Sequence, residues 1–451
     1  MIGCSERTRV KPVAATNAAF PLDDYITRLR QSDTAPVIGQ VTRAIGLLVE
    51  SIGPAASVGE ICEVRTGSGV PLPVEVVGFR DGRLLSVPLG ETAGVRPGDR
   101  IVARGGALTV PVGDGLLGRV IDGLGRPIDG LGPLLTNESA PIRPDALNPM
   151  DRESIKVPIG TGVRAIDALL TCGRGQRIGV FGGSGVGKST LLGMMARGTE
   201  ADVVVLGLIG ERGREVRSFI EHDLGPRGLE RSVVVVSTSD SPPLARQRAA
   251  YAATAIAEAF RDAGKNVLLM MDSITRFAMA QREVGLAAGE PPTAKGYPPS
   301  VFARLPGLLE RAGSLRDKGS ITAFYTVLVE GDDHNEPVAD AVRAILDGHI
   351  VLSRDLAARN HYPAIDVLPS VSRTMPSVTT VEHRTKAGQV REWLSTIRDN
   401  EDLVSVGAYV PGSNPRIDAA LAHREAIGRF LCQPADMGGR LADAVDALQA
   451  L

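Results

Sequence analysis

Cysteine, aromatic residues and long apolar runs are all scarce in this sequence. Only four cysteines occur among 451 residues, and they are widely spaced with no CxxC pair. This spacing argues against a zinc site and against a disulfide framework, so we expect reduced thiols in a cytosolic protein. No stretch approaches the ~20 apolar residues that span a membrane, and the N-terminus lacks the apolar core of a signal peptide.

The chain also has almost no net charge. Its 50 Lys and Arg residues nearly balance 52 Asp and Glu residues, which leaves a formal charge of −2. The whole chain therefore offers no electrostatic case for nucleic-acid binding. Its 43% hydrophobic and 23% charged content is typical of globular proteins, and its length predicts about three domains.

The most informative motif that is present is FGGSGVGKST at residues 181–190. It stands between an apolar run and an amphipathic segment, an order that predicts strand, glycine loop and helix. Gly182, four residues, then Gly187-Lys188-Ser189 is the P-loop spacing, in which backbone N–H groups surround phosphate oxygens. We expect Lys188 to reach the β- and γ-phosphates of ATP and the Ser189 hydroxyl to bind Mg²⁺. The predicted nucleotide-binding residues are Gly182, Gly183, Ser184, Gly185, Val186, Gly187, Lys188, Ser189 and Thr190.

Changes in composition and residue pattern divide the chain into four parts. Residues 1–30 are polar and irregular, and we expect them to be flexible. Short β-rich runs between turns, such as 45–49 and 60–64, predict a small β-barrel over 31–104. We interpret it as a packing collar, with a ligand-binding barrel as the alternative. Residues 105–378 are predicted to form the P-loop ATPase domain, and residues 379–451 a helical domain.

Within the ATPase domain, apolar strands alternate with helices from about residue 176 to residue 353. Near-continuous Val, Ile and Leu runs predict a mostly parallel α/β sheet covered on both faces. Residues 117–129 are predicted to form a turn-rich connector. Ser241 is predicted to cap the following helix, with Pro242 at its first position.

Acidic residues follow two of the predicted strands, at the sheet edge where the P-loop also lies. Asp272 occupies the position that holds Mg²⁺ behind a P-loop. Glu211 is predicted to orient and polarise the water that attacks the γ-phosphate. The alternative for Glu211 is a carboxylate at a helix N-terminus, paired with Arg212 or Arg214.

Several of these segments resemble one known family. GGSGVGKS, GERGREV, VLLMMDSITRFA and HYPAIDVLPSVSR are similar to the catalytic β subunits of rotary F-type ATPases. GYPPSVFARLPGLLERAG resembles the type III protein-export ATPases, and GAYVPGSNPRID resembles their flagellar branch. The resemblance covers about residues 40 to 432 and implies a RecA-like P-loop core.

The resemblance also implies roles for individual residues. It makes Glu211 the catalytic carboxylate and Arg212 a contact of the γ-phosphate. It places the ring of Tyr362 against adenine, with a core aromatic as the alternative for this residue taken alone. Arg373 matches the arginine finger that reaches the neighbouring subunit's site, although the residue alone would fit an ordinary surface arginine. Because Lys188, Glu211 and Arg373 are in one chain, a single polypeptide would supply both halves of each site between subunits. Repeating this head-to-tail contact closes a ring if the rotation permits, and the family implies a homohexamer.

The leading functional hypothesis is a Mg²⁺-dependent ATPase of a flagellar type III export apparatus. It would lie in the cytoplasm at the inner face of the membrane and help to unfold export substrates and release them from chaperones. Implied partners are a stalk and regulator proteins, with no nucleic acid. The open alternatives are an injectisome ATPase, a proton-driven ATP synthase subunit, an RNA translocase and a non-catalytic nucleotide-binding scaffold. The C-terminal domain lacks the acidic segment of synthase β subunits, which weakens the synthase alternative.

Overall fold

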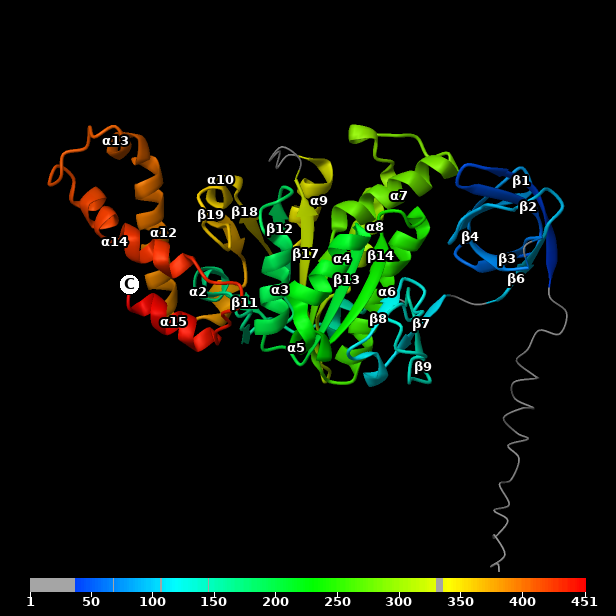
Figure 1. The fold of residues 1–451 in the computed structure, drawn as a ribbon, viewed down its shortest axis with the longest axis horizontal. Helices are drawn as coiled ribbons and strands as arrows, with labels where there is room; N and C mark the ends of the chain where they lie inside the picture. The colour runs from blue at the N-terminus through cyan, green and yellow to red at the C-terminus, as the bar shows by residue number, and fades with distance from the viewer. Residues whose placement is uncertain (1–36, 68, 106–107, 145, 330–335) are drawn as a thin grey trace, which may run out of the picture.

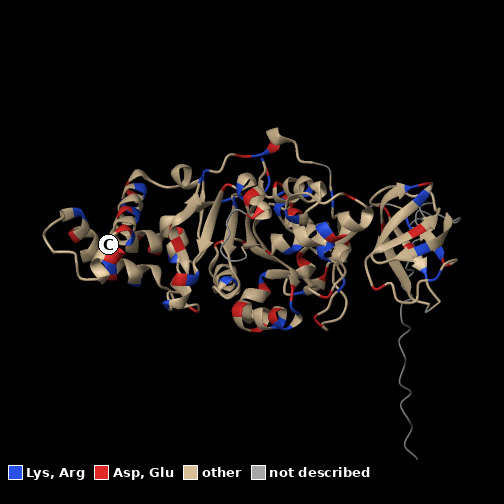
Figure 2. Cartoon of the chain, turned by 90° about the horizontal axis from the view of Figure 1, so that it is seen from above, with Lys and Arg blue, Asp and Glu red and all other residues tan. Residues whose placement is uncertain are grey.

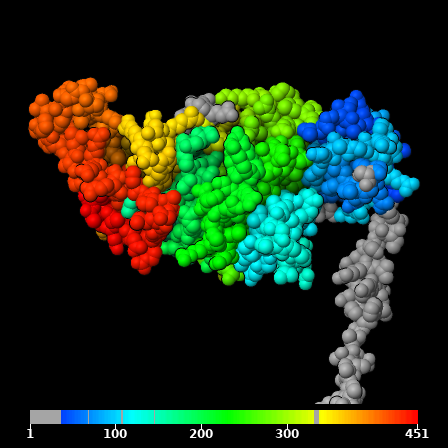
Figure 3. Space-filling view, viewed as in Figure 1, coloured from blue at the N-terminus to red at the C-terminus, as the bar shows by residue number. Residues whose placement is uncertain are grey.

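The protein is a row of three parts, with a β-barrel and a helical group at opposite ends of a sheet-based core (Figure 1). The computed structural model describes residues 37–67, 69–105, 108–144, 146–329 and 336–451. The segment predicted to be flexible, residues 1–30, lies outside these residues. The space-filling view shows the same three parts, with the core between the two ends (Figure 3). The predicted fold class is therefore confirmed.

The N-terminal part is a closed barrel in the order β1-β2-β5-β4-β3-β6, with every neighbouring pair antiparallel. Closure leaves no exposed strand edge. Alternate side chains fill the interior, including the fully buried Val49, Cys62, Val64 and Val74. The strands are β1 (Ile38–Ile45), β2 (Leu48–Ile52), β3 (Ile61–Arg65), β4 (Pro71–Arg80), β5 (Arg83–Pro88) and β6 (Arg100–Ala103).

A nine-stranded sheet forms the core, in the order β19-β18-β12-β17-β15-β13-β14-β8, with β16 paired beside β17. Neighbours from β18 to β8 are parallel, and only β19 and β16 run antiparallel to their partners. Its strands are β8 (Val120–Asp122), β12 (Arg177–Gly182), β13 (Val203–Glu211), β14 (Ser232–Thr238), β15 (Asn266–Asp272), β16 (Gly313–Ser314), β17 (Ser320–Leu328), β18 (Gly348–Leu352) and β19 (Ile365–Ser372). Two short ribbons pair β7 (Thr109–Val112) with β9 (Glu138–Pro141) and β10 (Pro158–Ile159) with β11 (Cys172–Gly173).

Helices cover both faces of this sheet, as continuous apolar strands require. One buried cluster joins the sheet to α6 (Pro243–Asp262), α7 (Ile274–Ala288), α8 (Pro299–Leu309) and α9 (Pro337–Ile345). The opposite face packs against α2 (Arg164–Leu169), α3 (Lys188–Gly198), α4 (Gly213–Ser218), the π-helical turn η3 (Phe219–Leu224), α12 (Val381–Asp399), α14 (Pro415–Leu431) and α15 (Leu441–Gln449). The remaining short helices are η1 (Asp114–Leu116), η2 (Pro149–Asp151), α5 (Gly225–Glu230), η4 (Ala294–Gly296), α10 (Arg354–Ala358), α11 (Met375–Val378) and α13 (Glu401–Ser405).

The structure corrects three local expectations. The connector at 117–129 contains β8, which pairs in parallel with β14 and ends the sheet. The run expected as one strand at 45–49 contains the end of β1, a two-residue turn at 46–47 and the start of β2, and the two strands pair as a hairpin through Ile45 and Leu48. Ser241 does not cap α6: Pro242 is the N-cap residue, and Ser241 donates its N–H to the carbonyl of Thr238 at 3.0 Å.

Both end parts are joined to the core by buried contacts. Leu85 and Val87 of the barrel pack against Leu244 of α6 and Val284 of α7. At the other end, Arg164 of α2 donates from Nε to the carbonyl of Phe430 at 2.6 Å, and from Nη2 to the carbonyl of Cys432 at 2.6 Å. The C-terminal helices are thereby tied to the segment that leads into the P-loop strand.

Charges of both signs are interspersed over all three parts in the view from above (Figure 2). Among the residues that the structure describes, no helix is long and apolar enough to cross a membrane.

Candidate active site

The P-loop joins β12 to α3 in the strand–loop–helix order that the sequence predicts. Gly187 is the N-cap residue of α3, and its φ of 84° lies in the left-handed region that favours glycine. Val186 is 2% exposed and anchors the loop in the core, whereas Ser184, Ser189 and Thr190 are exposed. The loop therefore has a fixed backbone with hydroxyl groups at its surface, beside a helix N-terminus that favours anions.

Lys188 and Asp272 form the buried ion pair of the site. The Lys188 ammonium lies 3.1 Å from Oδ1 of Asp272, with side-chain exposures of 10% and 6%. Asp272 ends β15, and Thr326 of the neighbouring strand β17 donates its hydroxyl to the same Oδ1 at 2.6 Å. The P-loop helix and the ends of two adjacent strands are thus joined at one carboxylate.

Glu211 ends β13, one strand away from Asp272, as the sequence predicts. The pairing of β13 with β14 shifts between Ile209 and Glu211, where Gly210 has a φ of 72°. A Cβ on Gly210 would lie 2.9 Å from Cβ of Arg276. This glycine therefore lets the strand end bulge while the first turn of α7 packs closely beside Glu211.

Burial raises the pKa of Glu211 to about 7, and the neighbouring charge of Asp272 adds to the rise. A hydrogen bond to Glu215 raises this pKa further, while the positive charges of Lys188 and Arg276 lower it. A carboxyl group with a pKa near neutrality exchanges protons readily at physiological pH, which suits a group that accepts a proton from an attacking water.

Arg212 follows Glu211 but points away from the core of the site. Its side chain is 66% exposed and pairs with Glu215 at 3.0 Å, one turn along α4. The alternative for Glu211 is an ion pair with Arg212 or Arg214. In the structure, Arg212 pairs with Glu215 instead. A contact with the γ-phosphate would require the guanidinium of Arg212 to leave Glu215.

Tyr362 lies beside the P-loop. A Cβ on Gly187 would be 3.3 Å from Cε1 of Tyr362, so the ring lies against the first turn of α3. The residue is 42% exposed, which makes it a surface aromatic rather than a core one. Its carbonyl accepts the N–H of Gln433 at 2.9 Å, which links this loop to the segment after α14. An exposed ring at this position offers a stacking surface to a flat base.

Arg373 lies at the other edge of the sheet. β19 runs antiparallel to β18, so Tyr362, just before β19, is near the P-loop edge, while Arg373, just after β19, is near the start of β12. The N–H of Arg373 donates to the carbonyl of Asp347 at 3.0 Å, and its side chain is exposed. At roughly 3.3 Å per residue, β12 separates this edge from its own P-loop by about 17 Å. The structure thus brings Lys188, Asp272, Glu211 and Tyr362 together and leaves Arg373 outside their group.

Two further arginines border the site and were missed from the sequence. Arg276 packs on Gly210 and acts on the charge of Glu211. Arg354, in the first turn of α10, has Nη2 2.4 Å from where a Cβ on Gly183 would stand, so it lies against the P-loop backbone. Arg276 stands within VLLMMDSITRFA, one of the segments that resemble the rotary ATPases, but its place beside Glu211 depends on how α7 packs against Gly210. Arg354 belongs to none of the motifs found in the sequence.

The donor groups at the site fit a magnesium ion, which Ser189 and Asp272 would hold. Ser189 is exposed in the first turn of α3, and Asp272 is the last residue of β15. Hard oxygen donors of this kind, few in number, suit Mg²⁺, which keeps most of its remaining positions for water and phosphate. Among the described residues, no group of three or more His, Cys, Asp or Glu side chains is arranged to hold a metal ion.

Comparison with known families matches all three parts of the chain. Residues 41–105 match the β-barrel domain of the ATP synthase alpha/beta family, and residues 162–372 match its nucleotide-binding domain. Residues 379–450 match the C-terminal domain of type III secretion ATPases related to EscN.

Individual relatives agree with these matches over nearly the full length. The chain is 54% identical to the flagellum-specific ATP synthase of Bacillus subtilis over 427 residues, covering 94% of this chain and 97% of that one. It is 53% identical to the type 3 secretion system ATPase of Xanthomonas euvesicatoria, covering 88% and 90%. It is also similar to the solved structure of assembled EscN in complex with its central stalk EscO from enteropathogenic E. coli. For that structure the TM-score is 0.85 at 44% identity, covering 91% of this chain and 99% of that one.

The barrel, the nucleotide-binding core and the C-terminal helices of this chain each match a domain of these families. This chain therefore belongs to the ATP synthase alpha/beta family and, within it, to the flagellar and type III secretion ATPases.

Proposed function

We propose that this chain hydrolyses ATP in a flagellar protein-export apparatus and couples hydrolysis to the release of export substrates from chaperones and to their unfolding. The observation that carries the proposal is the position and environment of the Glu211 carboxyl group. A carboxyl group with a pKa of about 7 lies beside the Lys188–Asp272 pair, in a chain whose C-terminal domain is that of secretion ATPases. A nucleotide-binding scaffold needs the P-loop but not this acid.

Each residue of the group has a distinct task in hydrolysis. The P-loop backbone and Lys188 bind the phosphates and offset the charge that develops on the transferring group. Ser189 and Asp272 would hold Mg²⁺, which would supply positive charge to offset that of the phosphates. Glu211 orients the attacking water and accepts its proton. Arg212 turns from Glu215 toward the γ-phosphate, and Tyr362 stacks on adenine.

Arg373 supports the further proposal that the active unit is a ring. Because it lies across the sheet from its own P-loop, it can complete only a site to which another copy supplies Lys188 and Glu211. Repeating this head-to-tail contact closes a ring when the rotation permits. We propose a homohexamer with the barrels as its collar.

The partners proposed here follow the family. The relative EscN has been solved with its central stalk EscO, and we propose that this chain likewise binds a stalk protein, together with regulators, export substrates and chaperones. The proposed location is the cytoplasm, at the inner face of the membrane, and no nucleic acid is among the partners. An injectisome ATPase is the second candidate, because identity to the Xanthomonas protein is 53%, close to the 54% for the flagellar relative.

The decisive experiment combines an assay in solution with one in cells. Purified protein should release phosphate from ATP only with Mg²⁺, and Glu211→Gln should bind ATP with little release. In a flagellated bacterium whose own flagellar export ATPase has been deleted, this chain should restore secretion of filament protein while Glu211→Gln should not. Phosphate release without restored secretion there, but with restored injectisome secretion, would favour the second candidate. Absence of Mg²⁺-dependent release would refute both.

A further inference from the structure

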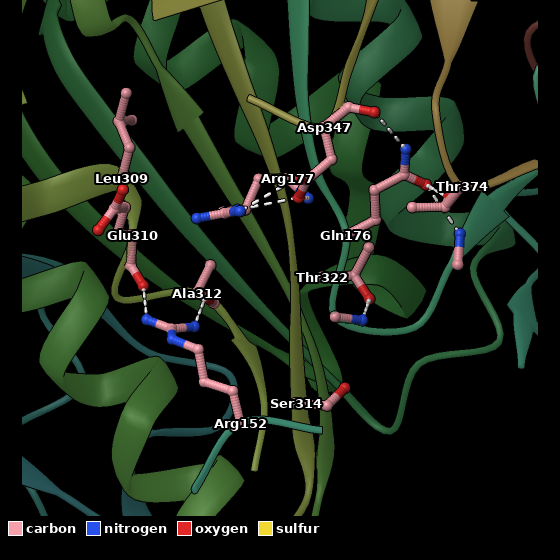
Figure 4. Close-up of polar contacts among 12 residues, drawn as sticks. Arg152, Gln176, Arg177, Leu309, Glu310, Ala312, Ser314, Thr322, Asp347 and Thr374 are labelled. Carbon is pink, nitrogen blue, oxygen red and sulfur yellow. Dashed lines mark hydrogen bonds and ion pairs between the residues drawn. The ribbon is translucent and has the colours of Figure 1, made fainter. Parts of the chain in front are cut away.

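A hydrogen-bonded network at the start of β12 surrounds the backbone of Arg373. Gln176 is fully buried and uses its entire amide: Oε1 accepts from the N–H of Gly173 at 2.9 Å and from the Thr374 hydroxyl at 2.5 Å. Nε2 donates to the carbonyl of Asp347 and to Oγ of Ser372, both at 3.1 Å. Figure 4 shows this amide between Asp347 and Thr374. The residues on both sides of Arg373 are therefore held by one side chain.

Asp347 fixes Arg373 itself. Its carbonyl accepts the N–H of Arg373 at 3.0 Å. Its carboxylate accepts from Nε and Nη2 of Arg177, both at 2.9 Å, in a bidentate pair visible in Figure 4. Bidentate pairs of this kind fix geometry more strictly than a single contact. The loop that carries Arg373 is thus fastened to the first residue of β12.

The packing around this loop leaves little room for movement. A Cβ on Gly348 would lie 2.5 Å from the carbonyl oxygen of Val371 and 3.1 Å from Cα of Ser372. Ser372 also donates its hydroxyl to the carbonyl of Thr171 at 2.8 Å. Between these contacts the backbone at 372–374 is held in place, while the Arg373 side chain remains exposed.

We infer that Gln176, with the Arg177–Asp347 pair, positions Arg373 for action on the neighbouring subunit's nucleotide. This inference rests on the proposed role of Arg373 in trans. The same strand, β12, carries its own P-loop at one end and fastens the arginine for the next site at the other. A positioning role predicts a defect in the neighbour's site, whereas a purely structural role in β12 predicts a defect in the chain's own P-loop.

Mixed rings separate these two roles. Gln176→Ala should lower kcat by about 10²-fold with little change in KM, the cost of misplacing a catalytic group by about 1 Å. Mixed with Lys188→Ala, which keeps an intact Gln176 and Arg373, it should regain activity. Mixed with Arg373→Ala it should regain none, because both chains then lack a placed arginine. Thr374→Val, which removes the hydroxyl that donates to Gln176 at nearly constant shape, should show the same pattern more weakly.

The controls keep the inference distinct from the proposed function. Gln281→Ala, at a buried glutamine that donates to Oγ of Ser300 at 2.9 Å in the α7–α8 contact, tests the loss of a buried amide away from Arg373. If Gln281→Ala lowers kcat at all, mixing it with Lys188→Ala chains should not restore the activity. Recovery of Gln176→Ala with Arg373→Ala, or recovery with neither partner, would overturn the positioning role. Failure of Lys188→Ala and Arg373→Ala to complement each other would instead refute the trans assignment itself.

Discussion

Tyr362 and Arg373 lie at opposite edges of the core sheet, because the antiparallel strand β19 runs between them. Tyr362 is against Gly187 of its own P-loop, while Arg373 is fastened beside the start of β12. Under the proposed function, this short stretch of chain would serve two different sites, with the tyrosine at its own site and the arginine at that of a neighbour.

The first prediction concerns Tyr362. Tyr362→Ala should raise KM for ATP with little change in kcat, because stacking on the base is equally strong in the ground and transition states. Tyr362→Phe keeps the ring and should be nearly neutral. Steady-state phosphate release over a range of ATP concentrations measures both constants. A large fall in kcat at unchanged KM would contradict the proposed contact with adenine.

The second prediction concerns Lys188. Lys188→Ala removes the charge that offsets the transferring phosphoryl group, and we expect turnover to fall by at least about 10²-fold. Lys265→Ala is the matched control, since this exposed lysine lies just before β15, at the end of the strand away from Asp272. Turnover near that of the unmodified protein in Lys188→Ala would show that the P-loop assignment is wrong.

The third prediction is a pH dependence. The pKa of Glu211 in the chain without nucleotide is raised to about 7, and the ionised form accepts the proton of water, so kcat/KM should rise as pH increases through about 7. Well below that pKa the slope should approach about tenfold per pH unit. Glu211→Gln should reduce kcat/KM by about 10²-fold or more and remove this limb. The test is kcat/KM for MgATP between pH 5.5 and 9, and a flat profile from pH 6 to 8 in the unmodified protein would refute the role.

The fourth prediction concerns Arg276, whose positive charge lowers the pKa of Glu211. Arg276→Ala removes that charge, so the acidic limb of the kcat/KM profile should move to higher pH. Arg276→Lys keeps the charge and should leave the limb near its original position. The pH of half-maximal kcat/KM is the readout, which separates the electrostatic effect from any general loss of rate. An unmoved limb in Arg276→Ala would exclude this coupling.

Local patterns predicted the P-loop, Asp272 and Glu211, because each stands at a strand end and parallel strands bring their carboxyl ends to one edge. Arg276 and Arg354 could not be predicted this way, since their places depend on helices that fold back against Gly210 and Gly183. β8 was missed because its three residues lie in a turn-rich segment and join the sheet through β14, which is distant in the sequence. The direction of β19, which separates Tyr362 from Arg373, is a tertiary property that no local spacing encodes.

The most direct test of the trans arrangement mixes two inactive chains. Arg373→Ala and Lys188→Ala should each be inactive alone, and the specific activity of the unmodified protein should rise with concentration as subunits assemble. Mixed in equal amounts, about a quarter of the interfaces would join an intact Lys188 and Glu211 to an intact Arg373 of the neighbour. Phosphate release at fixed total protein, with gel filtration to establish mixed rings, should therefore recover toward that fraction. Mixed rings with no more activity than either parent would contradict the account.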